Sequence, residues 1–480
     1  MAEFEGGIPE LEGAGPVGTR KQFIIYLLVT TAIAAGLWFL LGNVKQTIAG
    51  TIFLALVIGT LMFWRFRVGI AFIGIVILLL TRTIDLKHTI EFMSLDVIIF
   101  LVGMMVIVGL LRRSGFFRWL LAASLKLTKF RPNLLYIAVM TLAAVMAALV
   151  DEVTSILFVT ALVLDLCDYF EVKPVNYVIA VVLATNIGST WTVLGNPIGI
   201  LIALRSGLTF EDFIVTAFPI GVMALIFLII VCLIWQRKDL RQLSEKVKAR
   251  PITEQVQFLN QWARIKDRRL FTGSAIIFVL VIISLALHYR LELLLELEHN
   301  TLLVASSIAG AGAVMLWQRK DAKDFIMKDV DWWTLTFFMF LFAKAGTIQY
   351  VGLTDVIADS LGGLLTMAGG SALIIVVILW LTGFTSAAMD NVVVVAAFIP
   401  VIMSLTASVG SPVLWWALLF GGCYGGNMTM VGSTANIVAL GVLEVRKGVH
   451  MTFKYWIGIG LLGSLIPMAV ATLLLLLFFR

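Results

Sequence analysis

The chain has 480 residues, of which 61% are hydrophobic and only 13% are charged, with a mean hydropathy of +1.04. Soluble domains carry about a quarter charged residues, so this composition excludes a soluble fold and predicts an all-α polytopic membrane protein. The three cysteines and four histidines stand at no metal-ligand or disulfide spacing. No nucleophile–base pair or phosphate loop indicates an enzyme, and we expect no cofactor.

In chain order, residues 1–21 are predicted to form a short tail, and the first apolar run begins near Phe23 without a small-residue cleavage site. This predicts a retained helix rather than a signal peptide. Residues 22–235 and 271–480 are predicted to be two transmembrane halves, with about 10–12 transmembrane helices in total. Residues 236–270 contain ten Lys and Arg residues, which predicts a cytoplasmic linker. The net charge of +6 arises mostly there, so it does not indicate nucleic-acid binding.

Asp151 and Asp390 each interrupt an apolar stretch, in two segments that are similar to each other. The first reads AALVDEVTSILFVTALVLDL and the second reads SAAMDNVVVVAAFIPVIMSL. A carboxylate at membrane depth is costly unless it faces a partner, a water-filled cavity or a transported ion. One such carboxylate in each half predicts a secondary transporter with its site near the bilayer midplane.

Four landmarks recur in the two halves at nearly one spacing. The pairs and their offsets are Asp96 and Asp331 (331 − 96 = 235), Gly115 and Gly352 (237), Asp151 and Asp390 (239), and Gly195 and Gly432 (237). Two unrelated bundles would not be expected to share them. We therefore predict two repeats, which in transporters of this design are commonly inverted.

Each tip carboxylate lies between two short apolar arms. Leu134 to Val150 is 17 residues, or about 26 Å as a helix, and Val153 to Cys167 is 15 residues, or about 22 Å. A bilayer core of about 30 Å requires about 20 residues. We therefore predict re-entrant hairpins at about 134–167 and 372–407. Two tilted short helices joined by a surface loop are the alternative, but neither tip has flanking Lys or Arg residues.

A Gly-, Asn- and Thr-rich interruption follows each hairpin, at about 185–199 and 425–436. Pro197 removes a helical hydrogen bond, and the glycines lower the cost of leaving helical geometry. Such backbone at membrane depth is tolerated where it lines a cavity or meets protein partners, which predicts two broken helices around an ion site. Glycine-mediated helix packing is the alternative, but it leaves the recurring amides unexplained.

The candidate substrate- or ion-binding residues come from the two hairpins and the two interruptions. They are Asp151, Glu152, Thr154, Asn186, Ser189, Thr190, Thr192, Asn196, Asp390, Asn391, Asn427, Thr429, Ser433, Thr434 and Asn436. We expect an alkali cation to bind at Asp151 and Asp390. Lys344 lies in the middle of an apolar segment, too far from either end to reach an interface readily, so it is a candidate charge partner for a carboxylate.

Three carboxylates, Asp151, Glu152 and Asp390, would bring up to three negative charges to one buried volume. Crowded like charges favour binding of a proton, a cation, or both in competition. This predicts a Na⁺ or Li⁺/proton antiporter, with H⁺ and/or Na⁺ as the coupling ion. Efflux of neutral arsenite or antimonite, proton- or sodium-coupled transport of an anion, and an ion channel remain alternatives. A doubly negative substrate would be repelled unless these groups were protonated or paired.

The stretches that carry a family resemblance are SLDVIIFLVGMMVIVGLLRRSGFF, the VDEVT tip, TNIGSTWTVLGNP, MDNVVVVAAFIP and GGNMTMVGSTAN. They resemble the ArsB/NhaD permease family of the ion transporter superfamily, from about Ile48 to the C-terminus, and most closely its P-protein-like branch. They are distantly similar to divalent-anion/sodium symporters and citrate-transporter-like proteins. The resemblance implies inverted repeats of about five spans each, a multi-pass protein of the cell inner membrane, and a homodimer that moves its site by an elevator-type shift.

Two departures from that family pattern concern charge. Relatives in the P-protein-like branch commonly have Asp-Asn at both hairpin tips, whereas the first tip here is Asp151-Glu152. They also have Gly-Asp-Pro-Pro-Asn in the first broken helix, where this chain has Gly195-Asn196-Pro197. One carboxylate is therefore lost in the broken helix and one is gained at the hairpin tip.

Overall fold

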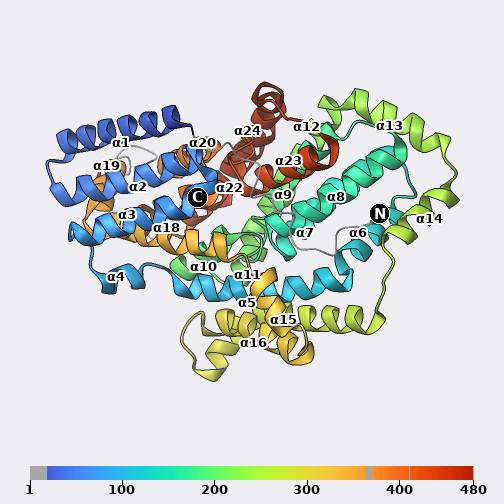
Figure 1. Cartoon of the computed structure of the whole chain (residues 1–480), viewed down its shortest axis with the longest axis horizontal. Coiled ribbons are helices and arrows are strands. Elements are labelled where there is room, and N and C mark those ends of the chain that lie inside the picture. The colour runs from blue at the N-terminus through green and yellow to red at the C-terminus, as the bar shows by residue number, and fades with distance from the viewer. Residues whose placement is uncertain (1–18, 364–369, 410, 479–480) are drawn as a thin grey trace.

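The computed structural model describes residues 19–363, 370–409 and 411–478, and over these ranges it is helical with no strand (Figure 1). Eight of its helices are long and apolar enough to cross a membrane, and six shorter apolar helices accompany them. The predicted all-α multi-pass membrane fold is confirmed. Most of the predicted tail, 1–21, lies outside the described residues, and α1 (Arg20–Leu41) begins with a capping box at Thr19.

The two halves contain the same elements in the same order. The first half contains α2 (Val44–Met62), α3 (Arg67–Leu80), α5 (Leu95–Ser114), α6 (Phe116–Leu127), α7 (Pro132–Leu149), α8 (Glu152–Phe170), α9 (Val175–Gly188), α10 (Pro197–Ser206) and α12 (Phe218–Trp235). The second half contains α15 (Arg268–Leu295), α16 (Thr301–Trp317), α18 (Trp332–Tyr350), α19 (Leu353–Gly362), α20 (Gly370–Ala388), α21 (Asn391–Val409), α22 (Val413–Gly425), α23 (Thr434–Lys447) and α24 (Phe453–Phe478). Short α4 (Leu86–Glu91), α11 (Phe210–Asp212) and α17 (Ala322–Asp324) connect them, and α13 (Arg237–Ala249) and α14 (Ile252–Trp262) lie between the halves.

From α5 onward the corresponding helices start at an almost constant offset. The starts differ by 332 − 95 = 237 for α5 and α18, 370 − 132 = 238 for α7 and α20, 391 − 152 = 239 for α8 and α21, and 434 − 197 = 237 for α10 and α23. Gly115 and Gly352 also adopt the same left-handed conformation, with φ of 79° and 72°, where glycine avoids the Cβ clash. The repeat is therefore structural.

The repeats are inverted, because corresponding helices run in opposite directions. Arg112 and Arg113 at the end of α5 form ion pairs with Asp329, just before the start of α18, and the Arg113 pair measures 2.6 Å. At the other end of α18, the Tyr350 hydroxyl lies 3.4 Å from Asp85, just before the α4–α5 segment. The end of α5 therefore lies near the start of α18, and the end of α18 lies near the start of the α4–α5 segment.

The first hairpin, α7 with α8, has both open ends on one side of the molecule. Near the start of α7, the Tyr136 hydroxyl donates to Gln236 at 2.8 Å, and just beyond α8, Lys246 of α13 pairs with Glu171 at 2.7 Å. Both open ends of the hairpin therefore lie against the same linker helix, at the right of the molecule in Figure 1. Lys246 and Arg250 also hold the pKa of the exposed Glu171 carboxyl below its usual value, through a hydrogen bond and charge attraction.

The arm lengths differ from those predicted. α7 and α8 have 18 and 19 residues, and α20 and α21 have 19 each, so every arm is longer than the 15 to 17 residues expected. Length alone therefore does not exclude full spans for the first hairpin. The contacts with α13 place both open ends on one side, as they would for two full spans, so the re-entrant hairpin stays a prediction.

Each half contains one broken helix, formed by α9 and α10 in the first half and by α22 and α23 in the second. The two halves pack together through these broken helices. α10 of the first half packs against α21 of the second hairpin, and α23 of the second half packs against α8 of the first hairpin. A second set of contacts joins α5 to α15 and α16, along the lower edge in Figure 1, and joins α18 to α2 and α3. Each half therefore contributes both to the site region and to the helices around it, α2, α3, α5, α15, α16 and α18, which we call the frame helices.

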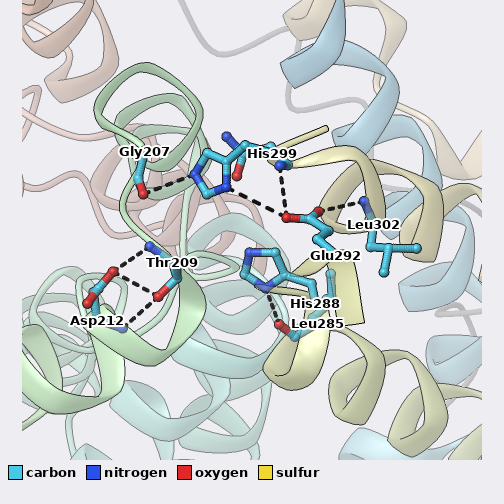
Figure 2. Close-up of polar contacts among 9 residues, drawn as sticks. Gly207, Thr209, Asp212, Leu285, His288, Glu292, His299 and Leu302 are labelled. Carbon is cyan, nitrogen blue, oxygen red and sulfur yellow. Dashed lines mark hydrogen bonds and ion pairs between the residues drawn. The ribbon is translucent and has the colours of Figure 1, made fainter. Parts of the chain in front are cut away.

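Opposite the linker, a turn between α15 and α16 is tied to the end of α10 (Figure 2). The buried Glu292 carboxylate accepts backbone N–H bonds from Asn300 at 3.1 Å and Leu302 at 2.8 Å, and so caps the start of α16. His299 contacts the Gly207 carbonyl through Nε2 at 3.1 Å and lies 3.6 Å from Glu292 through Nδ1. This contact holds α10 against the frame helices.

Replacement of Glu292 with Ala is expected to lower the free energy of unfolding by about 1–3 kcal/mol, because two buried N–H groups lose their acceptor. Thermal unfolding in detergent measures the change. His299→Ala is the matched control with a smaller expected loss, since that side chain is 42% exposed. An unchanged melting temperature for Glu292→Ala would show that the cap contributes nothing.

Candidate functional site

The two hairpin tips place aspartates at equivalent helix starts. Asp151 caps α8 by accepting the Thr154 N–H at 2.8 Å. Asp390 caps α21 by accepting the Val392 N–H at 3.0 Å, and its second oxygen accepts the Thr434 hydroxyl at 2.6 Å. Asp residues favour these positions because the carboxylate satisfies free N–H groups and meets the positive end of the helix dipole. Both predicted tips therefore form as local sequence dictates.

Each broken helix is fixed to the hairpin of its own half by matching contacts. The Thr192 hydroxyl donates to the Ala148 carbonyl, and the Thr429 hydroxyl donates to the Ala387 carbonyl at 2.5 Å. A Cβ on Gly188 would lie 2.1 Å from the Ala144 carbonyl oxygen, and a Cβ on Gly425 would lie 2.2 Å from that of Gly383. The glycines therefore permit close backbone approach between hairpin and broken helix.

A buried amide cluster joins the two broken helices. Asn186 Nδ2 donates to Asn427 Oδ1 at 2.7 Å and to Asn436 Oδ1 at 2.8 Å, so both of its N–H groups are used across the halves. Asn427 in turn donates to the Leu183 carbonyl at 3.2 Å and the Gly463 carbonyl at 3.1 Å. Asn436 donates to the carbonyls of the second interruption. These three amides hold the halves together.

Two further contacts repeat the pseudo-two-fold relation. Asn196 Nδ2 lies 3.1 Å from Cys423 Sγ, and the Ser433 hydroxyl donates to Asn186 Oδ1 at 3.1 Å. Asn196 and Ser433 are equivalent (433 − 196 = 237), as are Asn186 and Cys423 (423 − 186 = 237). Asn196 also donates to Ser189 at 2.9 Å. Asn196 and Ser433 directly precede α10 and α23, and each thus contacts the last turn of the first part of the other broken helix.

Two buried side chains at the tips retain an unused polar atom. Glu152 is 1% exposed and its Oε2 accepts no hydrogen bond, although Ser189 and Asn196 lie near the carboxylate. Asn391, its equivalent in the second hairpin, is fully buried and its Nδ2 donates none. Buried polar groups are nearly always paired, so a ligand that supplied a hydrogen bond or a charge to these two atoms would be stabilised there.

The three carboxylates are electrostatically coupled without forming one cage. Glu152 lies within electrostatic range of both Asp151 and Asp390. Across the described ranges, however, no three His, Cys, Asp or Glu side chains gather closely enough to hold a metal ion. A cation at Asp151 or Asp390 would therefore take its other ligands from hydroxyl, amide or carbonyl oxygens, or from water. The three carboxylates therefore do not form a compact metal-binding group in the described ranges, and their convergence on one bound ion stays a prediction.

Arg67 is a charged neighbour of the site that sequence inspection missed. It is 6% exposed, donates to the Thr334 hydroxyl at 2.9 Å, stacks on Trp64 with 4.0 Å to the ring centre, and lies within electrostatic range of Asp390. In the sequence it looks like an ordinary charge beside a span. The break at Phe63, which ends α2 and starts a 3₁₀ turn, carries it inward.

Lys344 does not pair with a tip carboxylate. Its side chain is 1% exposed, and its ammonium contacts the Ile70 carbonyl at 3.4 Å in an apolar interface between α18 and α3. No ion pair of Lys344 occurs within the described part of the chain. The predicted charge partnership is therefore not seen, because α18 turns this side chain toward α3.

The remaining candidates divide between structural contacts and the site region. The Thr190 hydroxyl lies 3.3 Å from the Tyr424 hydroxyl and donates to the Ile187 carbonyl at 2.8 Å, so its polar capacity is used within the protein. Thr154 contributes its backbone N–H to Asp151. The structure thus brings the predicted residues of both halves together, but many of them bind one another. Their role in binding a ligand stays a prediction.

Comparison with known proteins assigns the family. A family model described as "CitMHS: Citrate transporter" matches residues 53–421. The chain belongs to this family. It is also 32% identical over 386 residues to an uncharacterized transporter of Mycobacterium tuberculosis, covering 79% of this chain and 85% of that protein. It is therefore a membrane transporter.

The human P protein is 26% identical over 450 residues, covering 78% of this chain and 52% of that protein. Two solved structures share the fold: the YdaH transporter of Alcanivorax borkumensis, with a TM-score of 0.55 over 82% of this chain and 86% of that one, and MtrF of Neisseria gonorrhoeae, with 0.53 over 83% of each. Identities of 16% and 14% make these likenesses of fold alone. The narrower resemblance to ArsB/NhaD permeases stays a prediction.

Asn186→Ala is expected to destabilise the protein on the order of 3 kcal/mol, because Asn427, Asn436 and Ser433 lose a buried partner together. Thr185→Val is the matched control at the neighbouring position. Its buried hydroxyl has no hydrogen-bond partner, so the expected change is within about 1 kcal/mol. Thermal unfolding of both variants measures the difference. Equal melting temperatures would contradict a role for the amide cluster in joining the halves.

Proposed function

We propose that this transporter exchanges Na⁺ or Li⁺ for protons by secondary active antiport. The observation that carries the proposal is the pair of acidic hairpin tips near the two broken helices, in which the Glu152 and Asp390 side chains are buried. Asp151 and Glu152 form no ion pair within the described residues, and one guanidinium, Arg67, lies in electrostatic range of Asp390. Three carboxylates against one arginine leave an excess of negative charge, which favours a proton or a cation as the bound species.

Alternation between the two membrane sides follows from the inverted repeats. The first hairpin opens on the linker side, and inversion directs the second hairpin to the opposite side. Exchange of conformations between equivalent elements would then move access from one side to the other. Basic residues concentrate on the linker side, which favours a cytoplasmic location for α13 and α14. An elevator-type movement and a homodimer in the inner membrane belong to the same proposal.

Citrate is the second candidate substrate, because the matching family model is described as a citrate transporter. The net negative charge of the tips opposes a free citrate anion. Citrate would require protonated carboxylates or an accompanying cation. Arsenite efflux has no corresponding support beyond the predicted resemblance.

The test uses purified protein in liposomes loaded with Na⁺, Li⁺ or K⁺ and diluted into cation-free medium, with a pH dye inside. Exit of Na⁺ or Li⁺ should draw protons in and acidify the lumen. Citrate and arsenite uptake are measured in the same preparation. Transport of either one, without any movement of protons driven by Na⁺ or Li⁺, would overturn the antiport proposal.

Asp390→Asn should lower cation-driven proton movement by about tenfold or more, because it removes one charge that holds the cation. Asp168→Asn is the matched control. It makes the same chemical change in a carboxylate that pairs with Lys447 and is 55% exposed, away from the tips. Full activity in a folded Asp390→Asn protein would remove Asp390 from the mechanism.

A further inference from the structure

The two hairpin tips are equivalent in position but not in charge. Each tip consists of an aspartate that caps the second arm, followed by the first residue of that arm: Glu152 in α8 and Asn391 in α21. These two residues are related by the repeat offset (391 − 152 = 239) and are exposed by 1% and 0%. The pseudo-two-fold symmetry of the site is therefore broken by one ionisable group.

The capping aspartates differ from Glu152 in the donors that reach their oxygens. Asp151 accepts a backbone N–H, and Asp390 accepts one on one oxygen and the Thr434 hydroxyl on the other. Donors that point at a carboxylate oxygen stabilise the charged state and oppose a proton there. Compared with a buried oxygen that has no donor, these oxygens are therefore better suited to bind a cation than a proton.

Glu152 has the opposite environment. Its Oε2 is buried and accepts no hydrogen bond. The ionisable groups that face it are Asp151 on its own hairpin, Asp390 on the second hairpin and the Cys423 thiol on α22. None of these is cationic. Ser189 and Asn196 lie near the carboxylate, but Oε2 has no donor, and a buried oxygen without a donor favours the protonated form.

We propose that Glu152 is the side chain that carries the coupling proton, and that Asn391 is its uncharged counterpart in the second repeat. This inference rests on the proposed antiport. In the empty site, Glu152 holds a proton on its carboxyl group. When Na⁺ or Li⁺ enters beside the tip carboxylates, the O–H bond breaks, the proton leaves to water, and the carboxylate oxygen becomes available to the cation. The site gains one positive charge with the cation and loses one with the proton, so its net charge does not change.

Asp151 and Glu152 are neighbours in the chain but differ in their contacts. The structure separates the two residues, because Asp151 is occupied with the start of α8 while Glu152 has an unused oxygen.

The experiment measures protons released when Na⁺ or Li⁺ is added to the full-length detergent-solubilised protein in weak buffer, together with the rise in melting temperature. The wild-type protein should release about one proton per bound cation. Glu152→Gln should still be stabilised by the cation but release less than about a tenth as many protons. The double variant with Glu152→Asn and Asn391→Glu moves the carboxyl group to the equivalent position and should recover release.

The outcomes separate the inference from the proposed function. Absence of cation-linked proton release in the wild type would contradict the antiport proposal itself. Release by the wild type and undiminished release by Glu152→Gln would overturn the assignment of Glu152 alone. If Glu152→Gln does not fold, the double variant is measured instead. Proton release by the double variant at the level of the wild type supports the assignment, and a folded double variant that releases no protons overturns it.

Discussion

The need to pair the buried backbone and amide groups of two interrupted helices governs this structure. α9 and α10, and α22 and α23, are separated by non-helical turns among apolar helices, and lipid could not satisfy their open ends. The molecule meets this requirement by crossing the halves: Asn186 of the first broken helix donates to Asn427 and Asn436 of the second, and α10 and α23 each pack on the opposite hairpin. Neither half could bury its broken helix alone, so the site forms only where the two repeats meet.

The same constraint explains why the site can be both stable and responsive. Most polar candidates are satisfied by one another, which fixes the loops and leaves little freedom there. Among the candidate binding residues, the buried side-chain atoms without a hydrogen-bond partner belong to the hairpin tips, at Glu152 and Asn391. Ligand chemistry is thus concentrated at two equivalent points, and charge at only one of them. Arg67 adds a fixed positive charge from α3 beside Asp390 without neutralising the first tip.

Features with a local cause could be predicted from the sequence. Glycines that require a left-handed backbone, such as Gly115 and Gly352, and aspartates that cap helices, such as Asp151 and Asp390, mark the same positions in both repeats, so the fold class and the repeat were predicted correctly. Features set by contacts between distant segments could not be. The pairing of Asn186 with Asn427 spans 241 residues. Arg67 is drawn inward by a break in α2, and Lys344 is turned toward α3 rather than toward a carboxylate. In these cases the partner depends on tertiary packing, which residue type and spacing do not determine.

A cation site at the junction of the two repeats would exist only in the native state. Thermal unfolding of the detergent-solubilised protein against increasing Na⁺, Li⁺, citrate and arsenite tests for this site, because a ligand bound only by the folded state stabilises it by mass action. The melting temperature should rise with Na⁺ or Li⁺ concentration at constant ionic strength and should not change with arsenite. A rise with citrate or arsenite, and none with either cation, would contradict such a site.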